Sequence, residues 1–191
     1  MKWFRMLAAI LVLAAFSAPT LATKRLELMT TSGSKVSPLV GKDRKATVLI
    51  FITQDCPISN SYAPEIERIY KTYRARKIAF FLVYVDPALS LENAKKHRSE
   101  FAYTCPALLD PKHELVRLTG ATVTPEATAL SPNGKLLYRG RIDDRAADFG
   151  KVRAHPDQRD LRVALDHIVA GKKVSRPNTK PVGCFIADLS K

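Results

Sequence analysis

The sequence predicts an α/β protein with a mixed central sheet and helices on both faces. Two runs, 46–53 and 78–85, are apolar almost throughout, which is typical of strands covered on both sides. Each run is followed by a segment with helical spacing, so the sheet is expected to begin with parallel strands. A Pro-Asn-Gly turn late in the chain predicts an antiparallel hairpin that closes the sheet.

The first half of the chain is expected to alternate between strands and helices. Residues 23–45 are mixed in polarity, contain a turn and predict a lead-in or an edge strand. After the first buried strand, residues 59–76 predict a helix whose apolar side holds Tyr62, Ile66, Ile69 and Tyr73. An Ala63-Pro64 pair inside this helix should kink it. Ser90 is a suitable N-cap for the next helix, residues 91–101.

The second half predicts a short strand and helix, then the hairpin and a final helix. Gly120 is expected to end the short helix in a left-handed conformation. Gly171 similarly ends the last helix, whose apolar residues recur at helical spacing. The predicted ranges are 107–110 for the strand, 112–119 for the short helix, 126–130 and 135–141 for the hairpin, and 159–170 for the last helix. The expected organisation is one domain at 46–171 with a tail at 172–191.

The N-terminus has the pattern of a secretory signal peptide. Lys2 and Arg5 precede an apolar stretch of 11 residues, and small residues at Thr20 and Ala22 predict cleavage after Ala22, so that residues 1–22 are removed. The apolar stretch is shorter than the roughly 20 residues that a membrane span needs. We therefore expect an exported protein, periplasmic or secreted, with no integral membrane span once the signal is removed; the alternative is an uncleaved N-terminal anchor.

The chain is basic, with 31 Lys and Arg against 18 Asp and Glu. The basic residues are spread along the whole sequence and are not interleaved with aromatic residues, which argues against a nucleic-acid partner. The four histidines stand at no ligand spacing and are expected at the surface, so neither a metal nor a cofactor is predicted. The sequence gives no signal for an oligomeric state.

Cys56 stands at the junction of the first buried strand and the first helix. Pro57 suits the first helical position, so the Cys56 sulfur should face unpaired backbone N–H groups, which favour thiolate over thiol. The neighbouring Asp55 opposes this by charge repulsion, so we expect a lowered thiol pKa that is not extreme. These features make Cys56 the candidate nucleophile.

The sequence resembles the thioredoxin-like superfamily over about residues 46–171. A strand leads into Cys56, and Pro64 follows eight positions later, as in thioredoxins; Ser59 then matches the second thioredoxin cysteine. Val123-Thr124-Pro125 resembles the cis-proline element that lies opposite the active-site cysteine. More narrowly, the DCPISNSYAPEIERIY segment and the VGCFIADL tail resemble exported bacterial redoxin-domain proteins of the alkyl hydroperoxide reductase/thiol-specific antioxidant type.

The departures from these families leave the reaction open. Ser59 cannot form a disulfide with Cys56, although its hydroxyl can donate a hydrogen bond to a thiolate. Thr53 matches the threonine of the peroxiredoxin motif, but Leu49 replaces its proline. Peroxiredoxins also need an arginine beside the thiolate, for which Arg139 and Arg141 are the candidates; both can equally be surface residues of an edge strand.

Three cysteines predict one disulfide and one free thiol in an exported protein. Cys105 precedes its strand and the tail leaves the last helix on the same side, so a structural Cys105–Cys184 disulfide is favoured. The alternative, Cys56–Cys184, requires the tail to run the length of the domain, and would make Cys184 a resolving cysteine.

The leading hypothesis is an exported thiol redox protein with a single nucleophilic cysteine in a Cys-x-x-Ser motif. Cys56 would attack a small peroxide or a disulfide of a redox partner protein, in a pocket shaped by Thr53, Ser59 and cis-Pro125. The alternative is a redox-inert thioredoxin-fold module that binds a partner, in which Cys56 would have the ordinary thiol pKa of about 8.5.

Overall fold

The structure is a computed structural model that describes residues 26–41 and 43–189. The predicted signal peptide, residues 1–22, lies outside the described residues. No helix among the described residues is long and apolar enough to cross a membrane.

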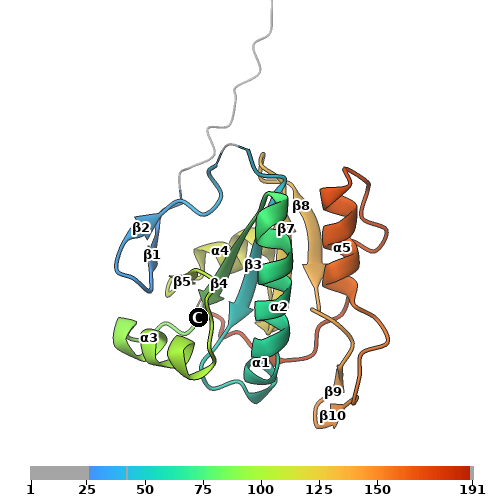
Figure 1. Cartoon of the computed structure of the whole chain (residues 1–191). Coiled ribbons are helices and arrows are strands. Elements are labelled where there is room, and N and C mark those ends of the chain that lie inside the picture. The colour runs from blue at the N-terminus through green and yellow to red at the C-terminus, as the bar shows by residue number, and fades with distance from the viewer. Residues whose placement is uncertain (1–25, 42, 190–191) are drawn as a thin grey trace, which may run out of the picture.

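A seven-stranded mixed sheet forms the centre of the protein, in the order β2-β1-β5-β4-β3-β7-β8 (Figure 1). Its strands are β1 (Leu28–Thr30), β2 (Lys35–Val36), β3 (Ala46–Ile52), β4 (Ile78–Tyr84), β5 (Ala107–Leu109), β7 (Glu126–Leu130) and β8 (Leu136–Gly140). β3, β4 and β5 are parallel, and all other pairs in this sheet are antiparallel. The predicted parallel start and closing hairpin are therefore confirmed.

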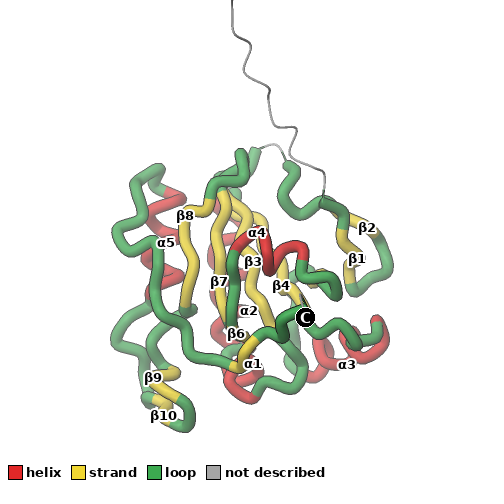
Figure 2. Tube along the Cα trace, turned by 180° about the vertical axis from the view of Figure 1, so that it is seen from behind, coloured by secondary structure: helices red, strands yellow, loops and turns green. Residues whose placement is uncertain are grey.

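Helices cover both faces of this sheet, as the sequence predicts (Figures 1 and 2). The helices are α1 (Pro57–Ser61), α2 (Ala63–Tyr73), the short 3₁₀ helix η1 (Arg74–Arg76), α3 (Leu91–Glu100), α4 (Glu114–Thr119) and α5 (Asp160–Val169). Ile66 of α2 and Leu165 of α5 belong to the core on one face, while Leu115 of α4 belongs to the core on the other.

β3 lies at the middle of the core, and all seven of its residues are buried. Val48, Ile50 and Ile52 join the cluster under α2 and α5, whereas Leu49 and Phe51 join the cluster under α4. Because successive side chains point to opposite faces, a strand covered on both sides has to be apolar throughout. This explains the continuous apolar run that marks β3 in the sequence.

The helix predicted at 59–76 is interrupted where the proline stands. α1 ends at Ser61 and α2 begins at Ala63, with Tyr62 between them. Pro64 lies in the first turn of α2, where its missing N–H leaves no intrahelical bond unmade. The expected kink is thus a break between two helices, and it places α1 at the end of β3.

Two small antiparallel pairs complete the described structure. β9 (Ala146–Asp148) pairs with β10 (Lys151–Val152), a hairpin that lies outside the predicted elements. β6 (Val123–Thr124) pairs with β11 (Cys184–Phe185), so the C-terminal tail joins the segment just before Pro125.

Candidate active site

Cys56 is the N-cap of α1, and Pro57 occupies the first helical turn, as predicted. The backbone N–H of Ser59 donates to the Cys56 Sγ at 3.4 Å. The Sγ also lies 3.0 Å from the carbonyl oxygen of Thr124, which can accept a hydrogen bond from the thiol in the reduced protein. Cys56 is only 1% exposed, so its sulfur is enclosed by protein.

The Thr124–Pro125 peptide bond is cis, in agreement with the resemblance to thioredoxin-like proteins. The Thr53 and Thr124 hydroxyls are 3.3 Å apart and share a hydrogen bond. Thr53 thus contacts the segment that precedes the cis-proline, and the structure gives no contact between its hydroxyl and Cys56 among the described residues.

Cys56 forms a disulfide with Cys184, with their Cα atoms 6.0 Å apart. The favoured pairing of Cys105 with Cys184 is therefore wrong, and the alternative that the sequence left open is the one found. Cys184 lies opposite Thr124 in the β11–β6 pair, which holds its side chain beside Cys56. The prediction of Cys56 as the free thiol is corrected together with the pairing.

The tail reaches Cys56 because it follows β8 along the sheet. The N–H of Arg139 donates to the Pro177 carbonyl at 2.8 Å, and the N–H of Thr179 donates to the Arg139 carbonyl at 3.1 Å. Residue 178 is parallel to β8 at this bridge, so the chain runs towards the edge of the sheet that carries Cys56. These backbone hydrogen bonds satisfy polar groups that the edge of β8 would otherwise leave open.

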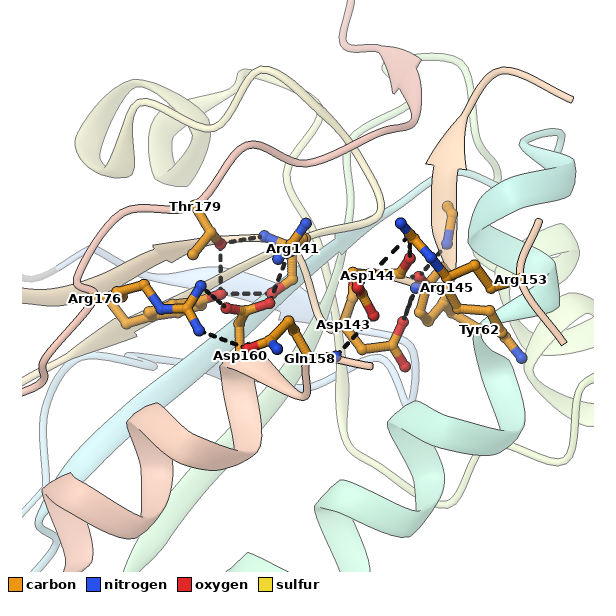
Figure 3. A network of polar contacts seen from close by, with 12 residues as sticks. Tyr62, Arg141, Asp143, Asp144, Arg145, Arg153, Gln158, Asp160, Arg176 and Thr179 are labelled. Carbon is orange, nitrogen blue, oxygen red and sulfur yellow. Dashed lines mark hydrogen bonds and ion pairs between the residues drawn. The ribbon is translucent and has the colours of Figure 1, made fainter. Parts of the chain in front are cut away.

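A polar network fixes the same part of the tail to the domain (Figure 3). The Thr179 hydroxyl lies 2.8 Å from the Tyr138 hydroxyl and accepts from the backbone N–H of Arg141. Asp160, at the start of α5, pairs with Arg141 at 2.7 Å and with Arg176 at 3.5 Å. The tail is therefore anchored as far as Thr179, and the segment 180–189 that carries Cys184 extends beyond this anchor.

The two arginines proposed to support a peroxide take part in other contacts. Arg141 holds Asp160, as described above. The Arg139 guanidinium donates to the Gly120 carbonyl at 3.0 Å and lies 3.8 Å from the Glu126 carboxylate. The structure gives neither side chain a contact with Cys56 among the described residues.

Ser59 lies beside the disulfide, but its hydroxyl makes no hydrogen bond to the Cys56 sulfur. The side chain is 1% exposed, and its Oγ has no hydrogen-bond partner within the described part of the chain. Of the polar groups of Ser59, the backbone N–H is the one that contacts the Cys56 sulfur. A buried hydroxyl without a partner is unusual, because the lost hydration is not compensated.

Cys105 is the free cysteine, and it is buried at 1% exposure. Burial raises the pKa of its thiol well above the ordinary value, and the nearby Glu67 carboxylate adds to this effect. Since the thiolate is the reactive form, we expect Cys105 to be unreactive in the folded protein.

We expect alkylation to distinguish Cys105 from the other two cysteines. After reduction, native protein treated with iodoacetamide should gain two alkyl groups, at Cys56 and Cys184, and the third only on unfolding. Intact mass and peptide mapping measure this. Rapid labelling of Cys105 in the native protein would contradict the assignment.

Gly183 allows the tail to approach the cis-proline segment closely. A Cβ at this position would lie 2.6 Å from the Thr124 carbonyl carbon and overlap its oxygen. That carbonyl also faces the Cys56 sulfur. A side chain at Gly183 would therefore push β11 away from β6.

Gly183→Ala should weaken the docking of β11 by about 1–3 kcal/mol, the usual effect of overpacking. The Cys56–Cys184 disulfide should then be reduced at a lower concentration of glutathione, as followed by alkylation and mass. Gly134→Ala is the matched control, because Gly134 lies in the turn between β7 and β8, with open space around it and a φ of +82°. It should lower overall stability without changing the disulfide equilibrium; equal shifts in both variants would contradict a specific contact.

His97 is a residue of this site that sequence reasoning missed. It was expected at the surface, but it is 5% exposed and contacts the segment between β3 and α1 through Asn60. His113, also expected at the surface, is 3% exposed and bonds to the Val85 carbonyl. The available signal was the spacing of Ala94 and His97, three residues apart on the buried side of α3.

The redoxin-family model described as the AhpC/TSA family matches residues 16–139, which is more than half of the chain. The chain belongs to the AhpC/TSA family. This AhpC/TSA protein therefore has a redoxin domain of thioredoxin-like fold, and family membership supports a thiol redox function. No curated protein matches it.

Solved structures agree with this fold. An uncharacterized conserved protein from Geobacillus kaustophilus is 27% identical, with a TM-score of 0.73 over 86% of this chain and 89% of that chain. A hypothetical protein from Sinorhizobium meliloti is 22% identical, with a TM-score of 0.71 over 87% of this chain and 92% of the other. A putative thiol:disulfide interchange protein DsbE from Chlorobium tepidum is 20% identical, with a TM-score of 0.57 over 75% and 92%.

Proposed function

We propose that this AhpC/TSA protein is an exported thiol–disulfide oxidoreductase whose redox pair is Cys56 and Cys184. The observation that carries the proposal is the disulfide between the N-cap cysteine of α1 and a cysteine on the tail. Ser59 occupies the place of a second cysteine in the Cys56 motif, so the tail cysteine supplies the missing partner. Cys184 is thus the proposed resolving cysteine, and Cys56 the proposed nucleophile.

The two sulfurs differ in solvent access, which favours attack by a partner thiolate on Cys184 rather than on Cys56. Cys56 is enclosed, whereas Cys184 is partly exposed and its neighbour Phe185 is 82% exposed. A groove of about 540 Å³ runs beside the tail and includes Gly183 and Phe185 in its wall. A thiolate of a reducing protein would therefore reach Cys184 first.

The proposed exchange has two steps. A partner thiolate forms a bond to the Cys184 sulfur, the Cys56–Cys184 bond breaks, and Cys56 leaves as a thiolate that accepts the Ser59 N–H. A second thiol of the partner loses its proton to water, attacks the mixed disulfide and forms a disulfide within the partner. Cys184 leaves as a thiolate and takes up a proton. The partner dithiol is oxidised by two electrons.

In the reduced protein, the Cys56 thiolate attacks the disulfide of a different partner, and Cys184 then attacks the Cys56 sulfur of that mixed disulfide. The Cys56–Cys184 bond forms again, and the partner leaves as a dithiol that takes up two protons.

Peroxide reduction has less support than disulfide exchange. The Thr53 hydroxyl pairs with Thr124, and the guanidinium groups of Arg139 and Arg141 bind carbonyl or carboxylate groups elsewhere. Leu49 also stands where the peroxiredoxin motif has its proline. Export remains part of the proposal and rests on the signal-peptide pattern of residues 1–22.

Parallel assays on the reduced protein test this function. Exchange with a disulfide-bonded model peptide should be readily measured, while hydrogen peroxide should be consumed slowly. Rapid peroxide consumption would instead favour the peroxidase. A protein that exchanges with neither substrate would support the redox-inert binding module.

A further inference from the structure

Three side chains form a hydrogen-bonded chain from the core to the segment that carries Cys56. The Tyr84 hydroxyl on β4 lies 2.8 Å from Nδ1 of His97 on α3. The other ring nitrogen of His97, Nε2, lies 3.0 Å from the Asn60 Oδ1 on α1. The Asn60 Nδ2 donates to the Gln54 carbonyl at 2.8 Å, two residues before Cys56.

The direction of each hydrogen bond follows from the last one. Because the Asn60 amide nitrogen donates to Gln54, its oxygen faces His97 and can only accept. Nε2 of His97 therefore carries the proton, and Nδ1 accepts from the Tyr84 hydroxyl. With the neutral ring, every group in the chain has its partner. A protonated ring would instead donate from Nδ1 to the Tyr84 oxygen, which leaves the Tyr84 O–H without an acceptor in the chain.

The surroundings of His97 favour the neutral ring. Burial lowers the His97 pKa, and the carboxylates of Glu100 and Asp55 act against that shift. The aromatic rings of Tyr84, Phe101 and Tyr103 lie 4.6–6.2 Å from the imidazole, measured between ring centroids. Lys96 shares a pocket of about 300 Å³ with His97, and the pocket also includes Gln54 and Asp55. Arg98, on the same helix, acts on the Tyr84 hydroxyl.

We propose that His97 is a positioning residue that fixes the Gln54–Cys56 segment through Asn60. This inference deepens the proposed function, because it assigns a positioning residue to the same sulfur. The chain orients α1 and the preceding turn, and so keeps the Ser59 N–H aligned with Cys56. Loss of the His97–Asn60 hydrogen bond would loosen this segment and weaken the stabilisation of the Cys56 thiolate.

The test measures the reactivity of the Cys56 thiol, which is readable whether or not the protein proves to be an oxidoreductase. In a Cys105→Ser/Cys184→Ser parent, Cys56 is the one cysteine left in the sequence, so the alkylation rate reports on its thiol. The alkylation rate with iodoacetamide is followed from pH 5 to pH 9, which gives the thiol pKa and the rate of the thiolate.

His97→Gln is the decisive variant, because a glutamine can accept from Tyr84 and donate to Asn60 without an imidazole ring. Its alkylation rate and thiol pKa should match those of the parent, the rate within about twofold, because the hydrogen-bonded chain is kept. A His97→Gln variant as slow as His97→Leu would show that the hydrogen bonds of the ring do not position the segment, and would overturn the proposal.

Two further variants separate positioning from folding. His97→Leu and Asn60→Ala both break the chain, and each should raise the thiol pKa and slow alkylation at pH 7 by roughly fivefold to tenfold, as expected for one lost buried hydrogen bond. Asn60→Ala leaves the Tyr84–His97 contact intact, so it provides the test if His97→Leu fails to fold. His155→Gln, at an exposed position, is the control that should match the parent. Parent-like thiol pKa and rate in folded Asn60→Ala would refute the positioning role.

Discussion

Cys56→Ser is expected to abolish thiol–disulfide exchange, a loss of at least about a thousandfold. The buried sulfur is the nucleophile of the reduced protein and the leaving group of the oxidised one, and a serine hydroxyl has a pKa too high for either role. Exchange with a disulfide-bonded model peptide measures the loss. The remaining fold should be preserved, because serine is close to cysteine in size.

The matched control for this variant is Cys105→Ser, which removes the buried thiol that has no part in the proposed cycle. It should retain exchange at close to the wild-type rate. Cys184→Ser should keep a reactive Cys56 but accumulate mixed disulfides with the peptide, because no resolving thiol remains. Exchange by Cys56→Ser at the wild-type rate would remove Cys56 from the mechanism.

Reduction of the Cys56–Cys184 disulfide is expected to lower the free energy of unfolding by about 2–4 kcal/mol. The two cysteines are 128 residues apart in sequence, so the bond closes a long loop in the unfolded chain and restricts it strongly. For a domain of this size the melting temperature should fall by about 4–16 °C. Thermal unfolding with and without reductant gives the value.

Without reductant, Cys184→Ser should already show the lower melting temperature of the reduced protein. Cys105→Ser is the control, because it keeps the disulfide and should still respond to reductant. The melting temperature of Cys184→Ser should not change when reductant is added, whereas that of Cys105→Ser should still fall. A melting temperature of the wild-type protein that is insensitive to reduction would contradict a disulfide that constrains the chain.

The helices, the buried strands of the central sheet and the β7–β8 hairpin could be predicted because their signals are local. The apolar run of β3 reflects two covered faces, and Ser90 caps α3 by accepting the Asn93 N–H at 3.1 Å. The break at Tyr62 follows from the proline that comes after it. Cys56 could likewise be identified as the candidate nucleophile, since its place between a strand and a helix is visible in the sequence.

The disulfide could not be predicted, because it depends on the path of the tail. That path is set by backbone hydrogen bonds between residues 177–179 and β8, which leave no side-chain pattern. The contact of Thr179 with Arg141 and the pairing of Asp160 with Arg176 also join segments far apart in sequence. The sequence likewise gives no sign of the carbonyl and carboxylate groups that Arg139 and Arg141 bind, and for this reason both residues could be assigned to a peroxide site.

The most direct test of the central claim is a redox titration of the purified protein in glutathione buffers, with peptide mapping under non-reducing conditions. We predict one reversible two-electron transition of the Cys56–Cys184 disulfide, with Cys105 reduced throughout. The midpoint should lie above about −300 mV, the level below which structural disulfides resist glutathione. A disulfide that stays oxidised in every buffer, or that maps to Cys105–Cys184, would contradict the proposed redox pair.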